Sequence, residues 1–249
     1  MTNSYVPKFS YIIPFRFRTD RIIPLRRVID WLNGFQGIEV IIVEQDTHSK
    51  ISHLNLRARH IFTQSEYSFN KSWAYNVGLR WSSSPIVIFG EADTIMNPHD
   101  LVRCLETFEG ESLDAVFPIK NIIRLDHMES LADLNVMFSI NRQEVLNSMT
   151  GGISIFKKES IQKIGGWNED FVGITIENKY QDMMVSKFLK WKHMDFSGFH
   201  LNHIPEKTDQ ALFQRSEKIM EGFSSATDDQ IRNHISTTAP KVGLLNKYQ

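Results

Sequence analysis

Short, continuous apolar runs alternate with amphipathic stretches in the first half of the chain, and this alternation limits the possible folds more than any other feature. A run such as IEVIIV at 38–43 shows no polar alternation, which favours a strand covered on both faces, as in a parallel sheet. Between two such runs, 24–32 repeats apolar residues at the spacing of an amphipathic helix. The pattern therefore predicts an α/β fold: one domain with a mixed, mainly parallel sheet flanked by helices. The predicted strands are 9–13, 38–43, 60–62 and 86–89.

The later part of the chain is less regular. Asn97 and Pro98 are typical of a helix start and predict a helix to about residue 108. A polar stretch at 121–150 is too long for a simple connector. We expect residues 1–205 to form the main domain and residues 206–249 to form a helical extension packed on it. The other predicted elements are helices at 69–81, 158–164 and 181–191 and strands at 114–119 and 153–156.

Composition excludes several classes of protein. The 28 Lys and Arg against 29 Asp and Glu give a net charge of -1, which argues against a nucleic-acid partner. The single cysteine, Cys104, excludes an internal disulfide and a cysteine-cluster zinc site. No apolar run approaches the ~18 residues of a membrane span, and residues 1–10 lack a signal-peptide pattern. These observations predict a cytoplasmic protein without a membrane span.

Charged residues follow the first two predicted strands, where α/β sheets bind ligands. Arg16 and Arg18 could bind a diphosphate through charge-assisted hydrogen bonds. Alternatively, they belong to a solvated basic edge that also includes Arg21, Arg26 and Arg27. After the second strand, Glu44 and Asp46 could hold a base or ribose, or could cap the next turn.

Two further pairs suggest a metal site. Glu91 and Asp93 end an apolar strand, and hard carboxylate oxygens suit magnesium or manganese bridged to phosphates. His200 and His203 lie three residues apart at a predicted strand end and could reach a metal. Each pair alone is a weak signal, because isolated acidic and histidine pairs also occur as surface features.

The order of the short motifs is more specific than any one of them. Together they resemble the β-1,4-galactosyltransferase family and related inverting glycosyltransferases of the GT-A fold, over about residues 9–205. IPFRFR at 13–18 resembles the family motif I-P-F-R-x-R, and VEQ at 43–45 lies at a similar strand end. FNKSWAYNVG at 69–78 resembles the motif F-N-R-x-x-x-x-N-V-G. EAD at 91–93 takes the place of D-x-D, and GGIS at 151–154 matches G-G-V-S. The resemblance implies that the nucleotide contacts are Pro14, Phe15, Arg16, Arg18, Glu44, Asn70, Lys71, Asn76, Glu91, Ala92, Asp93 and Gly152.

The same resemblance implies a metal site and a donor. Asp93 would be the principal acidic ligand of Mn²⁺ or Mg²⁺, and His203, with His200 near it, would supply the ligand from the far side. The donor would be a nucleotide diphosphate sugar, by resemblance a UDP-sugar. The acceptor would be a hydroxyl of a glycan, a glycolipid or another molecule.

The chain departs from the family where the catalytic base is expected. Family members have W-G-G-E-D after an F-x-G corner, whereas FVG at 171–173 is followed here by ITIENKYQD. The family's spacing places Glu177 and Asn178 on the Glu-Asp pair, which would replace the base with an amide. Four extra residues would place Gln181 and Asp182 there instead, and we expect this second alignment, with Asp182 as base and Glu177 as the alternative. Ile174 or its neighbours replace the Trp.

These motifs predict a metal-dependent inverting glycosyltransferase. Two alternatives stay open at this point. A nucleotidyltransferase would use similar carboxylates and arginines, but the chain lacks the glycine- and lysine-rich N-terminal loop expected for one. A non-catalytic nucleotide-sugar-binding module would explain the altered Glu-Asp motif.

Overall fold

The computed structural model describes residues 7–142, 144–146, 148–173 and 175–248. Within these residues one mixed sheet has nine strands, in the order β3-β2-β1-β4-β8-β6-β9-β5, with β7 paired to β6. The strands are β1 (Phe9–Phe15), β2 (Ile38–Asp46), β3 (Arg59–Gln64), β4 (Ile86–Gly90), β5 (Thr94–Met96), β6 (Ala115–Arg124), β7 (Glu144–Val145), β8 (Ile153–Lys157) and β9 (Trp191–His200). The predicted α/β fold with a mixed sheet is therefore confirmed.

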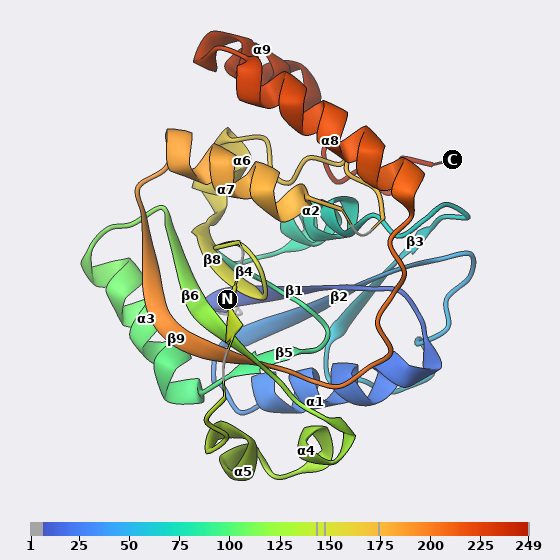
Figure 1. Ribbon diagram of the computed structural model, residues 1–249, viewed down its shortest axis with the longest axis vertical. Helices are drawn as coiled ribbons and strands as arrows, with labels where there is room; N and C mark the ends of the chain where they lie inside the picture. The colour runs from blue at the N-terminus through green and yellow to red at the C-terminus, as the bar shows by residue number, and fades with distance from the viewer. Residues whose placement is uncertain (1–6, 143, 147, 174, 249) are drawn as a thin grey trace, which may run out of the picture.

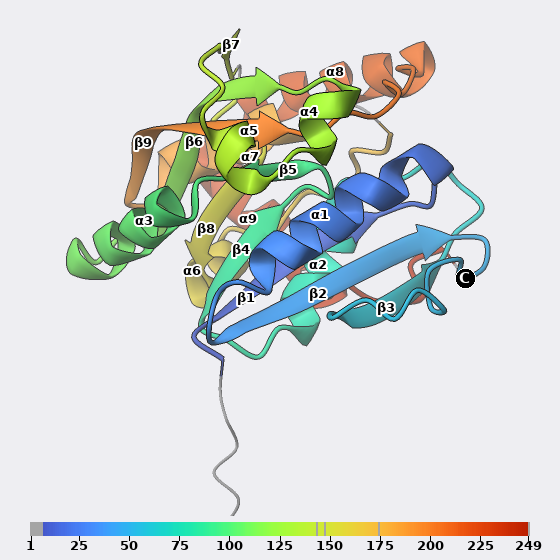
Figure 2. The ribbon, with the colours of Figure 1, turned by 90° about the horizontal axis from the view of Figure 1, so that it is seen from below.

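Helices cover both faces of this sheet (Figure 1). They are α1 (Ile22–Leu32), α2 (Lys71–Trp81), α3 (Pro98–Gly110), α4 (His127–Leu131), α5 (Leu134–Phe138), α6 (Lys158–Lys163), α7 (Glu177–Phe188), α8 (Gln210–Ser225) and α9 (Asp228–Thr238), with short 3-10 turns η1 (Thr19–Arg21) and η2 (Ala239–Lys241). Helices α1 and α3 lie on one face, and α2, α6 and α7 lie on the other (Figures 1 and 2). Each face has its own apolar cluster, because the buried strands send alternate side chains to opposite sides.

The first half of the sheet is the parallel part. Strand β1 pairs in parallel with β2 and β4, and β2 pairs in parallel with β3. The seven residues of β1 are all buried, as the unbroken apolar runs predict. Helix α3 begins as predicted, because the Asn97 side chain accepts a hydrogen bond from the His99 backbone and Pro98 occupies the first turn. This half aligns the carboxyl ends of β1, β2 and β4 along one edge.

The second half differs from the sequence prediction in two places. The helix predicted at 181–191 runs from Glu177 to Phe188. It ends early because Trp191 begins β9, which pairs in parallel with β6 from Ala115 onward. The polar stretch at 121–150 contains the end of β6, α4, α5 and β7. Strand β9 then places its last residue, His200, opposite Thr94 of β5.

The C-terminal helices lie outside α7 (Figure 1). Phe223 of α8 packs edge-on against Tyr180 of α7, with ring centroids 4.8 Å apart. Lys187 of α7 pairs with Asp228 of α9 at 2.9 Å. The division of the chain at residue 205 stays a prediction. None of the helices in the described ranges combines the length and apolarity that a membrane crossing requires.

Candidate active site

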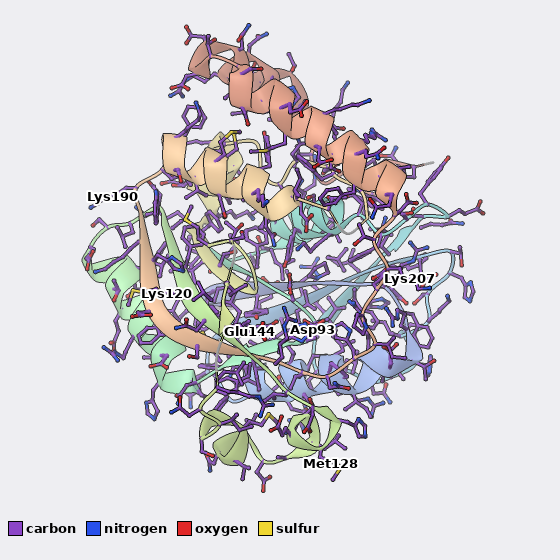
Figure 3. The ribbon with its side chains drawn as sticks, viewed as in Figure 1. Asp93, Lys120, Met128, Glu144, Lys190 and Lys207 are labelled. Carbon is purple, nitrogen blue, oxygen red and sulfur yellow. The ribbon has the colours of Figure 1, made fainter. Side chains whose placement is uncertain are left out.

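A carboxylate and two imidazoles converge where β4, β5 and β9 meet. Asp93 lies in the turn between β4 and β5, His200 ends β9, and His203 follows three residues later. The His203 Nε2 atom lies 3.0 Å from Asp93 Oδ2, and His200 Nε2 lies 3.8 Å from Asp93 Oδ1. One ligand atom from each of the three residues falls within 4.8 Å of the others. Figure 3 shows Asp93 near the middle of the molecule, at the edge formed by these strands.

Backbone pairing holds this group together. The Leu201 backbone N–H donates to the Asp93 carbonyl at 2.7 Å, next to the pairing of Thr94 with His200. The three metal-site candidates predicted from the sequence are thus brought together, although Asp93 and the histidines are more than one hundred residues apart in the chain.

The Asp93 carboxylate is ionised. Burial raises its pKa, but the hydrogen bond with His203 and the nearby charges of His200, His203 and Arg21 outweigh burial and lower the pKa to about 2. The hydrogen bond with Asp93 in turn raises the pKa of His203 above its usual value. A buried anion between two imidazoles is a suitable ligand set for a divalent cation that prefers oxygen and accepts nitrogen.

A cavity of about 490 Å³ opens beside this group. Its walls combine four acidic side chains with several basic ones, so it is suited to a ligand that carries charge. The lining includes Pro14, Arg21, Phe69, Lys71, Glu91, Ala92, Asp93, Arg124, Leu125, Gly173, Glu177, His200, Asn202, His203, Pro205 and Glu206.

Lys71 links two carboxylates on the cavity wall. Its Nζ atom lies 2.7 Å from Glu177 Oε1 and 3.2 Å from Glu91 Oε1, and it donates to Asn178 Oδ1 at 3.3 Å. Burial lowers the pKa of Lys71, but the charges of Glu177 and Glu91 outweigh it and raise the pKa. For Glu177, burial raises the pKa, and the charge of Lys71 overrides that effect and lowers it. Lys71 and Glu177 therefore both stay charged although they are largely shielded from water.

The two candidate bases have different surroundings. Glu177 is buried at the first turn of α7 and lines the cavity. Asp182 is one turn further along α7 and is absent from the described residues that line this cavity. Its carboxylate accepts four hydrogen bonds: from Ser148 Oγ, Met149 N, Thr150 N and Thr150 Oγ1, at 2.7 to 3.1 Å. Asp182 thus ties the loop before β8 to α7. Ile174 lies outside the described residues.

The predicted nucleotide contacts divide into two groups. Pro14, Lys71, Glu91 and Ala92 line the cavity together with Asp93. Gly152 lies next to it, because its carbonyl accepts a hydrogen bond from the Glu91 backbone at 3.2 Å.

The other predicted contacts have partners elsewhere in the protein. Arg16 donates to the Tyr67 carbonyl at 2.6 Å, and Arg18 pairs with Asp20 at 2.9 Å and donates to the Ile204 carbonyl. Phe15 is 1% exposed. None of these three side chains is among the described residues that line the cavity.

Glu44 and the two asparagines also have internal partners. Glu44 is held by Ser49, by the Lys50 backbone and by His60. Asn70 caps α2 by accepting from the Trp73 backbone at 2.9 Å. Asn76 donates to the Trp167 carbonyl and to Glu169. Glu44, Asn70 and Asn76 are likewise absent from the described residues that line the cavity.

Sequence reasoning missed Arg21 as a site residue and grouped it with a solvated basic edge. Its side chain is 21% exposed, lies 3.9 Å from Asp93 and 3.7 Å from Glu206, and lines the cavity. Arg124 and Asn202 were missed as well. The repeated arginines at 16, 18 and 21 were a signal, but only the fold shows which of them faces Asp93.

The sequence model of glycosyl transferase family 2 matches residues 10–165, more than half of the chain. The chain belongs to this family. The matched range covers the parallel half of the sheet and Asp93. The protein is therefore a glycosyltransferase, and its sheet and helices have the GT-A arrangement that the resemblance implied.

Solved structures agree on the fold. The catalytic domain of Drosophila β1,4-galactosyltransferase 7, in complex with xylobiose, is similar with a TM-score of 0.54 at 13% identity, covering 85% of this chain and 79% of that one. A mutant of the same Drosophila enzyme, in complex with manganese, UDP-Gal and xylobiose, has a TM-score of 0.52 at 14% identity, covering 83% and 78%. TarS from S. aureus has a TM-score of 0.60 at 14% identity, covering 92% of this chain but only 42% of TarS. No curated protein matches the sequence.

Proposed function

We propose that this glycosyltransferase is metal-dependent and inverting, and that it moves a sugar from a UDP-sugar to an acceptor hydroxyl. The single observation that carries the proposal is the convergence of Asp93, His200 and His203 at the edge of a charged cavity. The Drosophila structure with manganese and UDP-Gal supports the metal and the nucleotide by similarity of fold.

Asp93, His200 and His203 would hold Mn²⁺ or Mg²⁺. The Asp93 carboxylate is ionised, and the three ligand atoms are close enough to share one ion, so the residues fit this role. When bound, the metal stabilises the negative charge that develops on the departing diphosphate. Asp93 would be the principal acidic ligand. The Nε2 atom of His203 lies nearer to the Asp93 carboxylate than the Nε2 atom of His200 does.

Positive side chains of the protein complement the diphosphate. Arg21 lies at the cavity wall beside Asp93, and a guanidinium matches phosphate oxygens in charge and geometry. Lys71 lies on the wall of the same cavity, where it pairs with Glu91 and Glu177. The leaving group of the donor would bind in the cavity that these cations line.

Glu177 is the base that the geometry favours. It lines the cavity, and Lys71 keeps its carboxylate ionised and oriented. An ionised carboxylate at this position would take the proton from the acceptor hydroxyl as its oxygen attacks the anomeric carbon. Attack from the face opposite the leaving group inverts the configuration without a covalent intermediate. Asp182 is engaged by four donors and would position α7.

A donor screen tests this function. Calorimetry with UDP-glucose, UDP-galactose and UDP-N-acetylglucosamine, each with and without Mn²⁺, should show metal-dependent binding of at least one donor. The same series with Asp93→Asn is expected to show no metal dependence. Nuclear magnetic resonance of the transfer product should show the anomeric configuration opposite to that of the donor. Metal-independent binding, or retention of configuration, would refute the proposal.

A further inference from the structure

The two imidazoles of the proposed metal site are positioned by different parts of the protein. His200 is the last residue of β9 and is held by strand pairing with Thr94. His203 lies beyond the end of the sheet, in the segment 201–209, which belongs to no strand or helix. Figure 1 shows the chain between β9 and α8 running along α1, toward the end of α1 where η1 lies. Contacts with other elements must therefore hold His203 in place.

Arg18 and Asp20 bind both hydrogen-bonding groups of the residue that follows His203. Arg18 contacts Asp20 at two points, with Nε 3.1 Å from Oδ1 and Nη2 2.9 Å from Oδ2. The same Nη2 atom donates to the Ile204 carbonyl at 2.9 Å, and the Ile204 backbone N–H donates to Asp20 Oδ2 at 2.9 Å. The three residues thus form a closed network of hydrogen bonds that joins the start of η1 to the segment after β9.

The network is charge-assisted. Burial raises the pKa of Asp20, but hydrogen bonds from the Ile204 backbone and from Arg18 outweigh burial and lower the pKa. Hydrogen bonds to an ionised group are stronger than those between neutral groups. Arg21, the last residue of η1, adds a contact of 3.7 Å with Glu206. The turn after β1 therefore holds this segment at two points.

The Ile204 carbonyl also contacts the His203 imidazole. The distance between His203 Nδ1 and this carbonyl oxygen is 3.0 Å. A carbonyl only accepts hydrogen bonds, so Nδ1 carries the proton in this contact. The other nitrogen, Nε2, lies 3.0 Å from Asp93 Oδ2. Metal-binding histidines are commonly oriented in this way, with one nitrogen donating to a backbone carbonyl and the other left for the metal.

We infer that Arg18 and Asp20 are positioning residues, which fix the Ile204 carbonyl and thereby orient the His203 imidazole with Nε2 toward Asp93. Each peptide group is planar, so holding the N–H and the carbonyl of Ile204 sets the direction of the chain directly after His203. In treating this imidazole as a metal ligand, the inference rests on the proposed function.

This role differs from the nucleotide contact that the sequence predicted for Arg18. The side chain of Arg18 is absent from the described residues that line the cavity, and its partners are Asp20 and Ile204. Arg16 belongs to the same sequence motif and has the same charge, but it donates to the Tyr67 carbonyl. Arg16→Ala is therefore a matched control for Arg18→Ala.

Calorimetry with Mn²⁺ alone, without nucleotide, measures the effect on the proposed metal site. Arg18→Ala and Asp20→Ala should each weaken Mn²⁺ binding by about tenfold or more, as expected when the partner that orients a metal ligand is lost. Removal of a positive charge would by itself favour a cation, so weaker binding by Arg18→Ala reports orientation and not charge. Arg16→Ala should bind Mn²⁺ like the wild type. Wild-type affinity in a folded Arg18→Ala protein, or an equal loss in Arg16→Ala, would overturn the inference.

Nuclear magnetic resonance of isotope-labelled histidine, recorded in EDTA, tests the imidazole without a metal. The Nδ1–H proton of His203, assigned by its absence from His203→Ala, should exchange with water several times faster in Arg18→Ala and Asp20→Ala than in the wild type or Arg16→Ala. Equal exchange rates in all four proteins would overturn the inference, whether or not Mn²⁺ binds. If the wild type binds no Mn²⁺ but the proton behaves as expected, the metal-dependent function is refuted, while the orientation of the imidazole by Arg18 and Asp20 is supported.

Discussion

Asp182→Asn and Glu177→Gln should separate a structural carboxylate from a catalytic one. The Asp182 carboxylate accepts Thr150 N and Thr150 Oγ1 on one oxygen, and Ser148 Oγ and Met149 N on the other. An asparagine retains one acceptor oxygen and presents an NH₂ group to the remaining two donors. The Ser148 hydroxyl can rotate to another partner, but the Met149 backbone N–H cannot.

The size of the effect follows from these contacts. One backbone N–H left without an acceptor costs about 1–3 kcal/mol, and loss of the charge weakens the remaining bonds. We therefore expect Asp182→Asn to lower the free energy of unfolding by roughly 2–4 kcal/mol. For a chain of this size, about 2–4 °C is lost per kcal/mol, so Tm should fall by roughly 4–16 °C. Below that temperature, the folded variant should transfer sugar at a rate within a few-fold of the wild type.

Glu177→Gln should show the reverse behaviour. It removes the proton acceptor while keeping the shape of the side chain, and Lys71 still has Glu91 at 3.2 Å. Transfer should fall by ~10²-fold or more, as expected when a general base is lost, with donor affinity retained. Thermal unfolding followed by circular dichroism gives Tm, and initial rates at saturating donor give transfer. An Asp182→Asn enzyme that keeps its Tm but loses transfer, beside an active Glu177→Gln enzyme, would show that the alignment with four extra residues is right.

Three further predictions concern other parts of the molecule. Arg21→Ala should raise the donor KM more than Arg16→Ala, because Arg21 lines the cavity whereas Arg16 donates to the Tyr67 carbonyl. Steady-state kinetics measure both KM values, and equal effects would contradict the prediction. His203→Ala should weaken Mn²⁺ binding in calorimetry more than His200→Ala, because its Nε2 atom is nearer to Asp93; a reversed order would assign the stronger ligand to His200. Gly166→Ala should destabilise the fold by about 1–3 kcal/mol in urea unfolding, because φ is +71° and the new Cβ would meet Asn76. Gly110→Ala, whose Cβ would have no neighbour within 4 Å, is the control and should unfold at the same or a slightly higher urea concentration.

The sequence predicted the parallel half of the fold well, for physical reasons. Its strands are buried on both faces, so runs such as IEVIIV carry an unambiguous signal. Local capping chemistry at Asn97 likewise placed the start of α3. Strand β9, with the polar sequence WKHMDFSGFH, has only partly buried residues over most of its length, and β5 has just three residues. Such strands are defined by pairing with distant partners, which periodicity does not reveal.

The same distinction applies to the site. Asp93, His200 and His203 were predicted to share a metal because the family resemblance implied it, and the structure brings the three side chains together. Arg16 and Arg21 have the same side-chain chemistry, and their different positions depend on which way the turn after β1 directs them. Asp182 fitted a helix pattern, but its four donors come from residues 148–150, a contact that the local sequence of α7 does not encode.

The position of β9 between β6 and β5 makes the assembly of the proposed metal site a late event during folding. Asp93 lies in the first half of the chain, but His200 reaches it only after β9 has paired with both neighbours. Bringing Asp93 and His200 together closes a long loop, and this is slow compared with local structure formation. The chain loses conformational entropy on closing the loop before the strand pairing stabilises the fold. A chain still emerging from the ribosome can thus complete the β1, β2 and β4 sheet while it lacks two of its three metal-site side chains. The grouping of Asp93, His200 and His203 therefore coincides with completion of the whole sheet.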